Sequence, residues 1–393
     1  MVKVTVRRFR EGDEEKVLHF LKSVFGGWRS RRQWSWKFRE AEEAQHRKAI
    51  IWIMEDQGKI IGHLAAIPME LRIGSEVFPV CQLVDGALSP EYRHKGLYKN
   101  LFQGVLEDAV KSGYVVTFGF PNRFFHRLCE RQGGFQNICQ VSKMFKVLSI
   151  KNALSTLQIS LLTGNLVNSG GDSMFRDFLL TQRWKALSIL LDLFRKAVAS
   201  TVSSGLGSKQ KTDKILESKP IEAKALGTEF DSSWGRFSQE YRFSFERDRK
   251  YLNWRYSNPE AQYQAYIVTR GEHVAGYVVI ACEEGGISLG KLKVGGLKIG
   301  YIVDLVAEKD LKLQLLSIAE EELKKNQVCL ENCWTTEGSV FFGTLRAQQY
   351  YQLPDELYKV VFVANVHALH LGASISPEYS EDILLSLGDS DLV

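Results

Sequence analysis

The hydrophobic residues of positions 1–148 follow two different periods, and the change between them predicts the order of helices and strands. Apolar side chains recur with helical spacing over Glu14–Phe25, near Arg31–Glu43, over the stretch that opens at Leu97 and over Arg123–Gln132. Alternating or short apolar runs predict strands over residues 2–9, 49–55, 59–73, 76–88, 114–118 and 135–147. The predicted order is strand, two helices, three strands, helix, strand, helix and strand, which describes a mixed α/β domain.

The rest of the chain divides into three further regions. Residues 149–228 combine apolar helical segments with a Ser/Gly/Lys-rich stretch, and they predict a helical insert with a flexible linker. Residues 229–371 repeat the element order of the first region, although the repeat is weak at the level of residues. Residues 372–393 hold five acids and no Lys or Arg, so we expect an acidic tail that is mobile at its end.

A basic turn after the strand Gln82–Leu88 carries the strongest chemical signal. Ser89 and Pro90 end the strand, and R-H-K-G-L-Y at 93–98 opens a helix. A helix N-terminus presents unpaired N–H groups and the positive end of the helix dipole, so it can bind phosphate. Gly96 would let the backbone approach such a ligand closely. The plain alternative is a solvated basic turn before an ordinary surface helix.

Composition narrows the function classes. The chain has 393 residues and a net charge of +5, which is mild for this length and does not argue for a nucleic-acid partner. The six cysteines form no C-x-x-C pair, so we expect no metal site and free thiols in a reducing cytoplasm. The N-terminus is too charged for a signal peptide, and no apolar run is long enough to span a membrane. We therefore expect a cytoplasmic protein without an integral membrane segment.

The basic turn resembles motif A of the GNAT acyltransferases, Arg/Gln-x-x-Gly-x-Gly/Ala, and departs from it at Tyr98, where the family usually has Gly or Ala. The element order of residues 1–148 is also the GNAT order. The resemblance implies an α/β (α+β) GNAT fold, with a mixed, mostly antiparallel central sheet flanked by helices. The repeated element order in residues 229–371 extends the resemblance to a second GNAT-like domain. We call this second domain degenerate because no Arg-x-x-Gly turn follows the strand at Gly300–Val306.

In this family the motif holds the pyrophosphate of acetyl-CoA, so the resemblance implies acetyl-CoA as co-substrate. Backbone N–H groups of His94 through Lys99 would bind the phosphates, and a backbone N–H on the splayed fourth strand would face the acyl group. G-F-P-N at 119–122 resembles a GNAT subgroup in which the Asn contacts the pantetheine arm, although Asn122 is also a good helix N-cap. The expected CoA contacts are Ala87, Leu88, Arg93, His94, Lys95, Gly96, Leu97, Tyr98, Lys99 and Asn122.

The candidates for proton transfer are Asp85, Tyr98 and His126. Asp85 lies in an apolar strand, where burial would raise its pKa toward that of a useful base. Its counterpart Asp304, in a half without the CoA turn, favours a structural role for both. The family often uses a Tyr in the second helix as general acid, but the matching region here reads L-C-E-R-Q-G-G-F, with Cys129 near that place. The alternatives for this role are Tyr92, Tyr98, His126 and water.

These expectations combine into an N-acetyltransferase that transfers an acetyl group from acetyl-CoA to a primary amine. The acceptor is expected to be a small molecule bound in the groove between the two halves. The sequence also allows a homodimer. A second hypothesis is a non-catalytic CoA-binding or regulatory module. The absence of the family's Tyr general acid supports this hypothesis. A third is a tandem-GNAT transferase with another acyl or aminoacyl donor, against which the retained motif argues.

Overall fold

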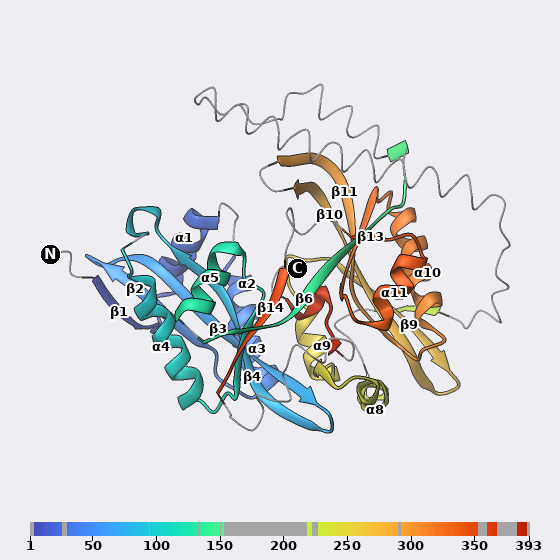
Figure 1. Cartoon of the computed structure of the whole chain (residues 1–393), viewed down its shortest axis with the longest axis horizontal. Coiled ribbons are helices and arrows are strands. Elements are labelled where there is room, and N and C mark those ends of the chain that lie inside the picture. The colour runs from blue at the N-terminus through green and yellow to red at the C-terminus, as the bar shows by residue number, and fades with distance from the viewer. Residues whose placement is uncertain are drawn as a thin grey trace.

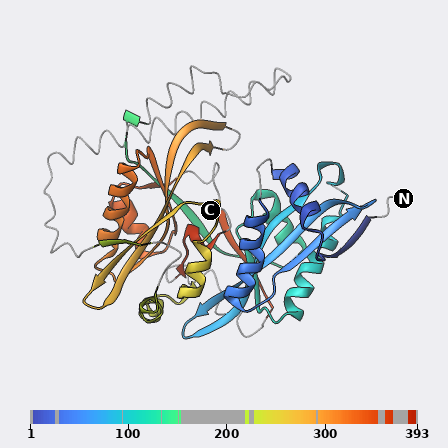
Figure 2. The same cartoon turned by 180° about the vertical axis from the view of Figure 1, so that it is seen from behind.

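The structure is a computed structural model that describes residues 4–25, 30–93, 95–132, 134–149, 151–152, 218–221, 227–289, 292–352, 360–367 and 383–390. Its architecture is a large mixed sheet with helices on both faces, drawn in Figure 1 and, from behind, in Figure 2. Antiparallel pairs dominate the sheet, as expected from the sequence. Nearly all of the predicted insert and linker at 149–228 lies outside the described residues.

The first part of the chain has the predicted order of elements. It forms β1 (Val4–Arg8), α1 (Glu14–Phe25), α2 (Arg31–Trp34), a π-helix (Ser35–Glu40), α3 (Ala41–Gln45), β2 (Ile50–Asp56), β3 (Lys59–Ile73), β4 (Glu76–Leu88), a 3-10 turn (Pro90–Tyr92), α4 (Tyr98–Lys111), β5 (Val116–Gly119), α5 (Arg123–Gln132) and β6 (Gln136–Val147). The predicted bounds of α1, β3, β4 and α5 are confirmed. The second predicted helix is interrupted by the π-helix, which periodicity did not reveal.

The second part contributes the remaining elements. These are β7 (Ser218–Ile221), α8 (Glu229–Phe237), a 3-10 turn (Ser238–Glu240), β8 (Phe243–Phe245), α9 (Arg249–Arg255), β9 (Tyr263–Arg270), β10 (His273–Leu289), β11 (Leu292–Ala307), α10 (Lys312–Lys325), β12 (Leu330–Thr336), α11 (Val340–Ala347), β13 (Tyr351–Gln352), β14 (Val360–Val366), β15 (Ile383–Leu384) and a 3-10 turn (Leu387–Asp389). Strands β10 and β11 extend beyond their predicted bounds, because their glycine-rich ends gave no strand signal.

Two strands cross between the parts of the molecule. The sheet runs β1-β2-β3-β4-β5-β14-β6-β12-β11-β10-β9-β7, so β14 lies between β5 and β6. Strand β6 pairs with β14 through Gln136–Val141 and with β12 through Val141–Val147. Figure 1 shows both strands passing between the cluster that holds α1 and α4 and the cluster that holds α10. The sheet is therefore continuous from the first residues described to the second part of the chain.

Three apolar cores fix the helices on this sheet. Helices α4 and α5 pack on one face of β2, β3 and β4. Helix α1, the π-helix, α8 and α9 share a core on the opposite face, which continues into the second part. Helices α10 and α11 close a third core on the far side of β10, β11 and β12. The end of β4 is thus covered by different helices on its two faces.

The π-helix is tied to α9 by two reciprocal hydrogen bonds. Trp36 Nε1 donates to the Trp254 carbonyl at 2.7 Å, and Trp254 Nε1 donates to the Trp36 carbonyl at 2.8 Å. The two indoles stack with ring centroids 5.8 Å apart. This double contact holds the first part of the chain against the second, and it fixes the register of the π-helix.

Residues 383–390 of the expected acidic tail pack inside the protein, and the end of that tail lies outside the described residues. Asp389 is 1% exposed and accepts hydrogen bonds from Arg247 at 2.7 and 2.9 Å. Arg247 is itself fully buried and also donates to Asp304 at 3.0 Å. A carboxylate can be buried when such a cation compensates its charge. The acidic residue thus anchors the segment inside the protein instead of keeping it in solvent.

Candidate functional site

A bulge interrupts strand β4 shortly before the basic turn. Val84 lies opposite Ala65, and Ala87 lies opposite His63, so Asp85 and Gly86 together face a single residue of β3. Asp85 has a φ of +52°, a backbone conformation that Asp tolerates better than most residues. Bulges of this kind reorient a strand end and are frequent beside active sites.

Strand β4 also separates from β5 at this end. The two strands pair only through Val80–Gln82 and Val116–Phe118. The residues of β4 from Leu83 to Leu88 therefore have β3 as a neighbour on one side and no β5 partner on the other. At Ala87 and Leu88, strand β4 therefore pairs with β3 alone.

The basic turn leads from the open strand end to the N-terminus of α4. Gly96 has a φ of +71°, and a Cβ added there would meet nothing within 4 Å. Leu97 caps the helix without a side-chain hydrogen bond, and the N–H groups of Lys99 and Asn100 donate at 3.3 Å to the carbonyls of Gly96 and Leu97. Lys95 and Lys99 are exposed beside it. The turn therefore has the conformation and space that an anion needs, while His94 lies outside the described residues.

Arg93 contributes to this turn in a different way. Its Nε donates to the Leu88 carbonyl at 3.2 Å, and the residue is exposed. The guanidinium therefore lies close to the end of β4 and keeps further N–H groups for a ligand, since a guanidinium carries five.

Tyr98 reaches back from the start of α4 over the bulge. Its hydroxyl would lie 2.7 Å from a Cβ built on Gly86, so only glycine fits beneath the ring. Its ring packs edge-on against Phe125 of α5. Burial, and then the neighbouring Cys129, raise the pKa of Tyr98 well above its usual value. The hydroxyl therefore keeps its proton at neutral pH and donates a long hydrogen bond, of 3.5 Å, to the His63 carbonyl of β3.

Asp85 lies on the other face of the bulge, in a buried ion pair. Both of its carboxylate oxygens are 3.3 Å from Lys37 Nζ of the π-helix, and both residues are buried. The Asp85 carbonyl accepts a hydrogen bond from His63 Nδ1 at 2.9 Å, which places the proton of the imidazole on that nitrogen. The carboxylate is therefore compensated by a fixed cation.

The remaining sequence candidates lie on α5. Asn122 Oδ1 accepts a hydrogen bond from the Phe125 N–H at 3.0 Å, so Asn122 caps this helix. His126 Nε2 lies 2.6 Å from Asn137 Oδ1, and its Nδ1 lies 3.6 Å from Glu130. These contacts direct His126 toward β6, whereas Tyr98 faces the bulge in β4.

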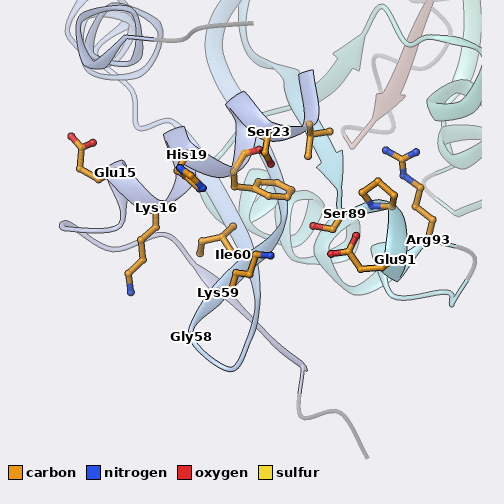
Figure 3. Close-up of a pocket in the computed structure, with 13 residues that line it drawn as sticks. Glu15, Lys16, His19, Ser23, Gly58, Lys59, Ile60, Ser89, Glu91 and Arg93 are labelled. Carbon is orange, nitrogen blue, oxygen red and sulfur yellow. The ribbon is translucent and has the colours of Figure 1, made fainter. Parts of the chain in front are cut away.

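A cavity of about 630 Å³ lies beside the basic turn, on the face covered by α1 (Figure 3). Helix α1 forms one wall, the β2–β3 turn forms the floor, and the segment from Ser89 to Arg93 forms the other wall. The lining residues are Glu15, Lys16, His19, Phe20, Ser23, Val24, Gly58, Lys59, Ile60, Ser89, Pro90, Glu91 and Arg93. Its size suits a small organic molecule.

Sequence reasoning missed two residues of this region, Lys37 and His63. Lys37 lies in a Trp-rich helical stretch, and the π-helix there brings its side chain to the bulge. The hydrophobic periodicity of the sequence does not indicate that this stretch changes from α-helix to π-helix. His63 lies within a long apolar strand and reads there as an ordinary core residue. The described part of the chain contains no cluster of three or more His, Cys, Asp or Glu placed to hold a metal ion. Within the same residues, no helix combines the length and hydropathy needed to cross a membrane.

Three solved structures with a similar fold are described as acyltransferases or probable acyltransferases. A GCN5-related N-acetyltransferase from Anabaena variabilis ATCC 29413 is 12% identical, with a TM-score of 0.59 over 93% of this chain and 74% of that one. A probable N-acyltransferase from Enterococcus faecalis V583 is 10% identical, with a TM-score of 0.56 over 93% and 73%. Saccharomyces cerevisiae N-myristoyltransferase with bound myristoyl-CoA is 11% identical, with a TM-score of 0.53 over 93% and 83%.

At the level of sequence, no curated protein matches the chain. A family model, described as acetyltransferase (GNAT) domain, matches residues 5–133. This range includes the bulge, the open end of β4, the basic turn and Tyr98. Residues 5–133 are therefore similar to a GNAT acetyltransferase domain, and the chain shares its fold with the solved structures named above.

Proposed function

We propose that the protein transfers an acetyl group from acetyl-CoA to a primary amine of a small molecule. The GNAT domain supports acyl transfer in general. The observation that carries the choice of a CoA thioester is the open turn at Gly96, which joins the unpaired end of β4 to an uncapped helix N-terminus. The presence of this turn also argues against the hypothesis of an aminoacyl donor.

In this proposal the phosphates of acetyl-CoA bind at the N–H groups of the first turn of α4. Arg93, Lys95 and Lys99 add positive charge from exposed positions, which favours a polyanion. The pantetheine arm lies in the opening between β4 and β5. A backbone N–H near Ala87 or Leu88 then donates to the thioester oxygen, where negative charge develops in the transition state.

The chemical step needs a proton taken from the amine and a proton given to the sulfur. The amine nitrogen forms a bond to the acyl carbon, the carbon–sulfur bond breaks, and CoA leaves as a thiolate. We assign Tyr98 to the hydrogen bond that stabilises this thiolate, because its protonated hydroxyl lies over Gly86. The proton of the amine passes to water, because Asp85 is held by Lys37 and His126 by Asn137.

A specific observation favours the alternative of a CoA-binding regulatory module. The Asp85 carboxylate is in a buried ion pair, and the family's Tyr in the second helix is replaced by buried Cys129, whose pKa burial raises to about 12. A regulatory module needs a CoA site without a proton route. One measurement separates the two hypotheses: an enzyme releases CoA from acetyl-CoA in the presence of amines, whereas a regulatory module does not.

We also propose that residues 229–371 form a degenerate second GNAT-like domain. Strands β9, β10 and β11 pair antiparallel, and β11 then pairs parallel with β12, as β2, β3, β4 and β5 do. A register shift in β11 beside Asp304 parallels the bulge at Asp85. The segment before α10 has no glycine to form a phosphate turn.

The test is calorimetric titration of the full chain with acetyl-CoA, followed by an assay of thiol release with a panel of primary amines. We expect micromolar binding, about −8 kcal/mol, and amine-dependent release of CoA. Binding without release by any amine would favour the regulatory module. The absence of binding would contradict both readings.

A further inference from the structure

We propose that the pocket lined by α1, the β2–β3 turn and Ser89–Arg93 binds the acyl acceptor, and that this acceptor is an amine that also carries a carboxylate on an apolar body. This is the charge pattern of an α-amino acid. The inference rests on the proposed acyl transfer and names the substrate class of the same site. It also moves the acceptor from the groove between the two halves, where the sequence placed it, to the GNAT domain alone.

The position of the pocket brings an acceptor to the acyl group from the side opposite to the one that α4 covers. Ser89 and Pro90 line the pocket and directly follow Ala87 and Leu88, whose backbone is unpaired toward β5. Phe20 of the α1 wall belongs to the core on one face of β4, whereas Leu97 and Tyr98 pack on the core of the other face. Two substrates can therefore meet at the end of β4 without competing for space.

The walls of the pocket combine an apolar part with isolated charges. Phe20, Val24, Ile60 and Pro90 supply apolar surface. Figure 3 shows the side chains of Lys59 and Glu91 pointing toward one another from different walls. Within the part of the chain that the structure describes, neither of them forms an ion pair.

Two opposite charges separated by a cavity match a ligand that carries both charges. Glu91 would hold the ammonium group of the free acceptor, and Lys59 would hold its carboxylate, since each charge gains from an opposite partner at short range. Lys16 adds further positive charge, and the side chain of Glu15 is directed to Arg31, with 3.6 Å between Oε1 and Nε. The pocket is therefore net positive and favours an acceptor with an acidic group over a simple amine.

The experiment compares acceptors that differ only in the carboxylate. L-Leucine and L-phenylalanine are assayed against isoamylamine and phenethylamine, with acetyl-CoA saturating and release of the CoA thiol as the readout. We expect KM at least tenfold lower for the better of the two amino acids than for its matched amine. Equal KM values for each pair, or turnover of neither pair by a protein that binds acetyl-CoA, would overturn the assignment.

The variants test the two charges separately. Lys59→Met should raise KM for the amino acid about tenfold and leave the matched amine unchanged, and Lys59→Arg should restore the wild-type value. Glu91→Gln should raise KM for both. Lys48→Met, at an exposed lysine outside the pocket, is the control and should change neither. A uniform change across amino acids and amines in Lys59→Met would overturn the role of the carboxylate.

Binding in the absence of CoA separates this inference from the proposed function. Saturation-transfer NMR with L-phenylalanine should show contact with the wild-type protein and a loss of signal in Lys59→Met, whether or not acetyl-CoA binds. Displacement of phenylalanine by 3′,5′-ADP would place the nucleotide phosphates in the pocket and overturn the assignment. Failure of acetyl-CoA to bind, with phenylalanine still bound, would instead contradict the proposed function.

Discussion

The Asp85 carboxylate lies 3.3 Å from Lys37 Nζ inside the core, with 3% and 6% of the two side chains exposed. The pair joins the bulge of β4 to the π-helix, and its counterpart in the second part of the chain joins Asp304 of β11 to Arg247. Both carboxylates occur at an irregular point of a strand that a helix or loop covers. The relationship points to a role in holding the strand end in place.

We expect Asp85→Asn to lower the free energy of unfolding by about 3–5 kcal/mol, because Lys37 would become an uncompensated buried charge. Denaturant unfolding measures this change. Asp310→Asn is the control, since Asp310 pairs with Arg270 at the surface, where an ion pair contributes at most about 1 kcal/mol. A variant with unchanged stability and lost turnover would contradict the structural role and make Asp85 the base.

Gly96→Val should abolish the affinity for acetyl-CoA while the fold persists, because valine strongly disfavours a φ of +71° and no packing contact is at stake. Calorimetry measures the affinity, and circular dichroism checks the fold. Gly96→Asn should keep most of the binding, since Asn tolerates this conformation.

Gly271→Val is the matched control for Gly96→Val. Gly271 has a φ of +63° and equal space around its Cβ position, but it lies in the β9–β10 turn. It should lose a similar amount of stability and keep full affinity. Weak acetyl-CoA binding in both variants would mean that strain, and not the turn, controls the site.

Tyr98→Phe should reduce kcat by roughly 10²-fold or more and leave KM for acetyl-CoA nearly unchanged, because the hydroxyl acts mainly on the leaving sulfur. Steady-state kinetics with a saturating amine measure both constants. The comparison is Tyr92→Phe, since the Tyr92 hydroxyl donates to Asp56 at 2.5 Å. Equal losses of kcat in the two variants would remove Tyr98 from its assigned role.

Glu331 predicts a pH dependence of stability. Burial raises the pKa of this fully buried carboxyl to about 8, and neighbouring Glu320 adds to the shift. The folded protein therefore keeps the proton between about pH 4.5 and pH 8, whereas the unfolded chain releases it above about pH 4.5. Since the unfolded state then binds fewer protons, stability falls as pH rises through this range and levels off above pH 8.

Glu331→Gln should remove most of this dependence and raise Tm at pH 8 more than at pH 5. Thermal unfolding across this pH range is the measurement. Glu272→Gln, at an exposed position, should follow the wild-type curve. A Tm difference between Glu331→Gln and wild type that stays constant with pH would show that Glu331 does not bind a proton on folding.

Periodicity and turn chemistry were sufficient for the order of elements in the first part of the chain, because each helix and strand there carries its own local signal. The same information could not reveal that Ser35–Glu40 forms a π-helix or that Lys37 meets Asp85. Both depend on contacts between segments distant in sequence. The burial of Asp389 could not be predicted for the same reason, since its partner Arg247 is far away along the chain.

In the candidate site, too, local features could be predicted from the sequence and contacts between distant segments could not. The turn at Gly96 was recognisable because its glycine and its place between strand and helix are local properties. The position of Tyr98 over Gly86, and the pocket beside Lys59, arise from the packing of α4, α1 and the β2–β3 turn on one strand end. No single segment of the sequence contains that information.

The insertion of β14 between β5 and β6 has a consequence for the order in which the protein can be made. Strand β5 pairs with β4 on one side, and its other neighbour is supplied by residues 360–366. When residues 5–133 have emerged from the ribosome, β14 has not yet been made. The edge of β5 that later pairs with β14 is therefore still exposed to solvent. The sheet that carries the proposed CoA site closes only after residues 360–366 have been made, so the growing chain depends on that distant segment to cover an edge that could otherwise pair with another chain.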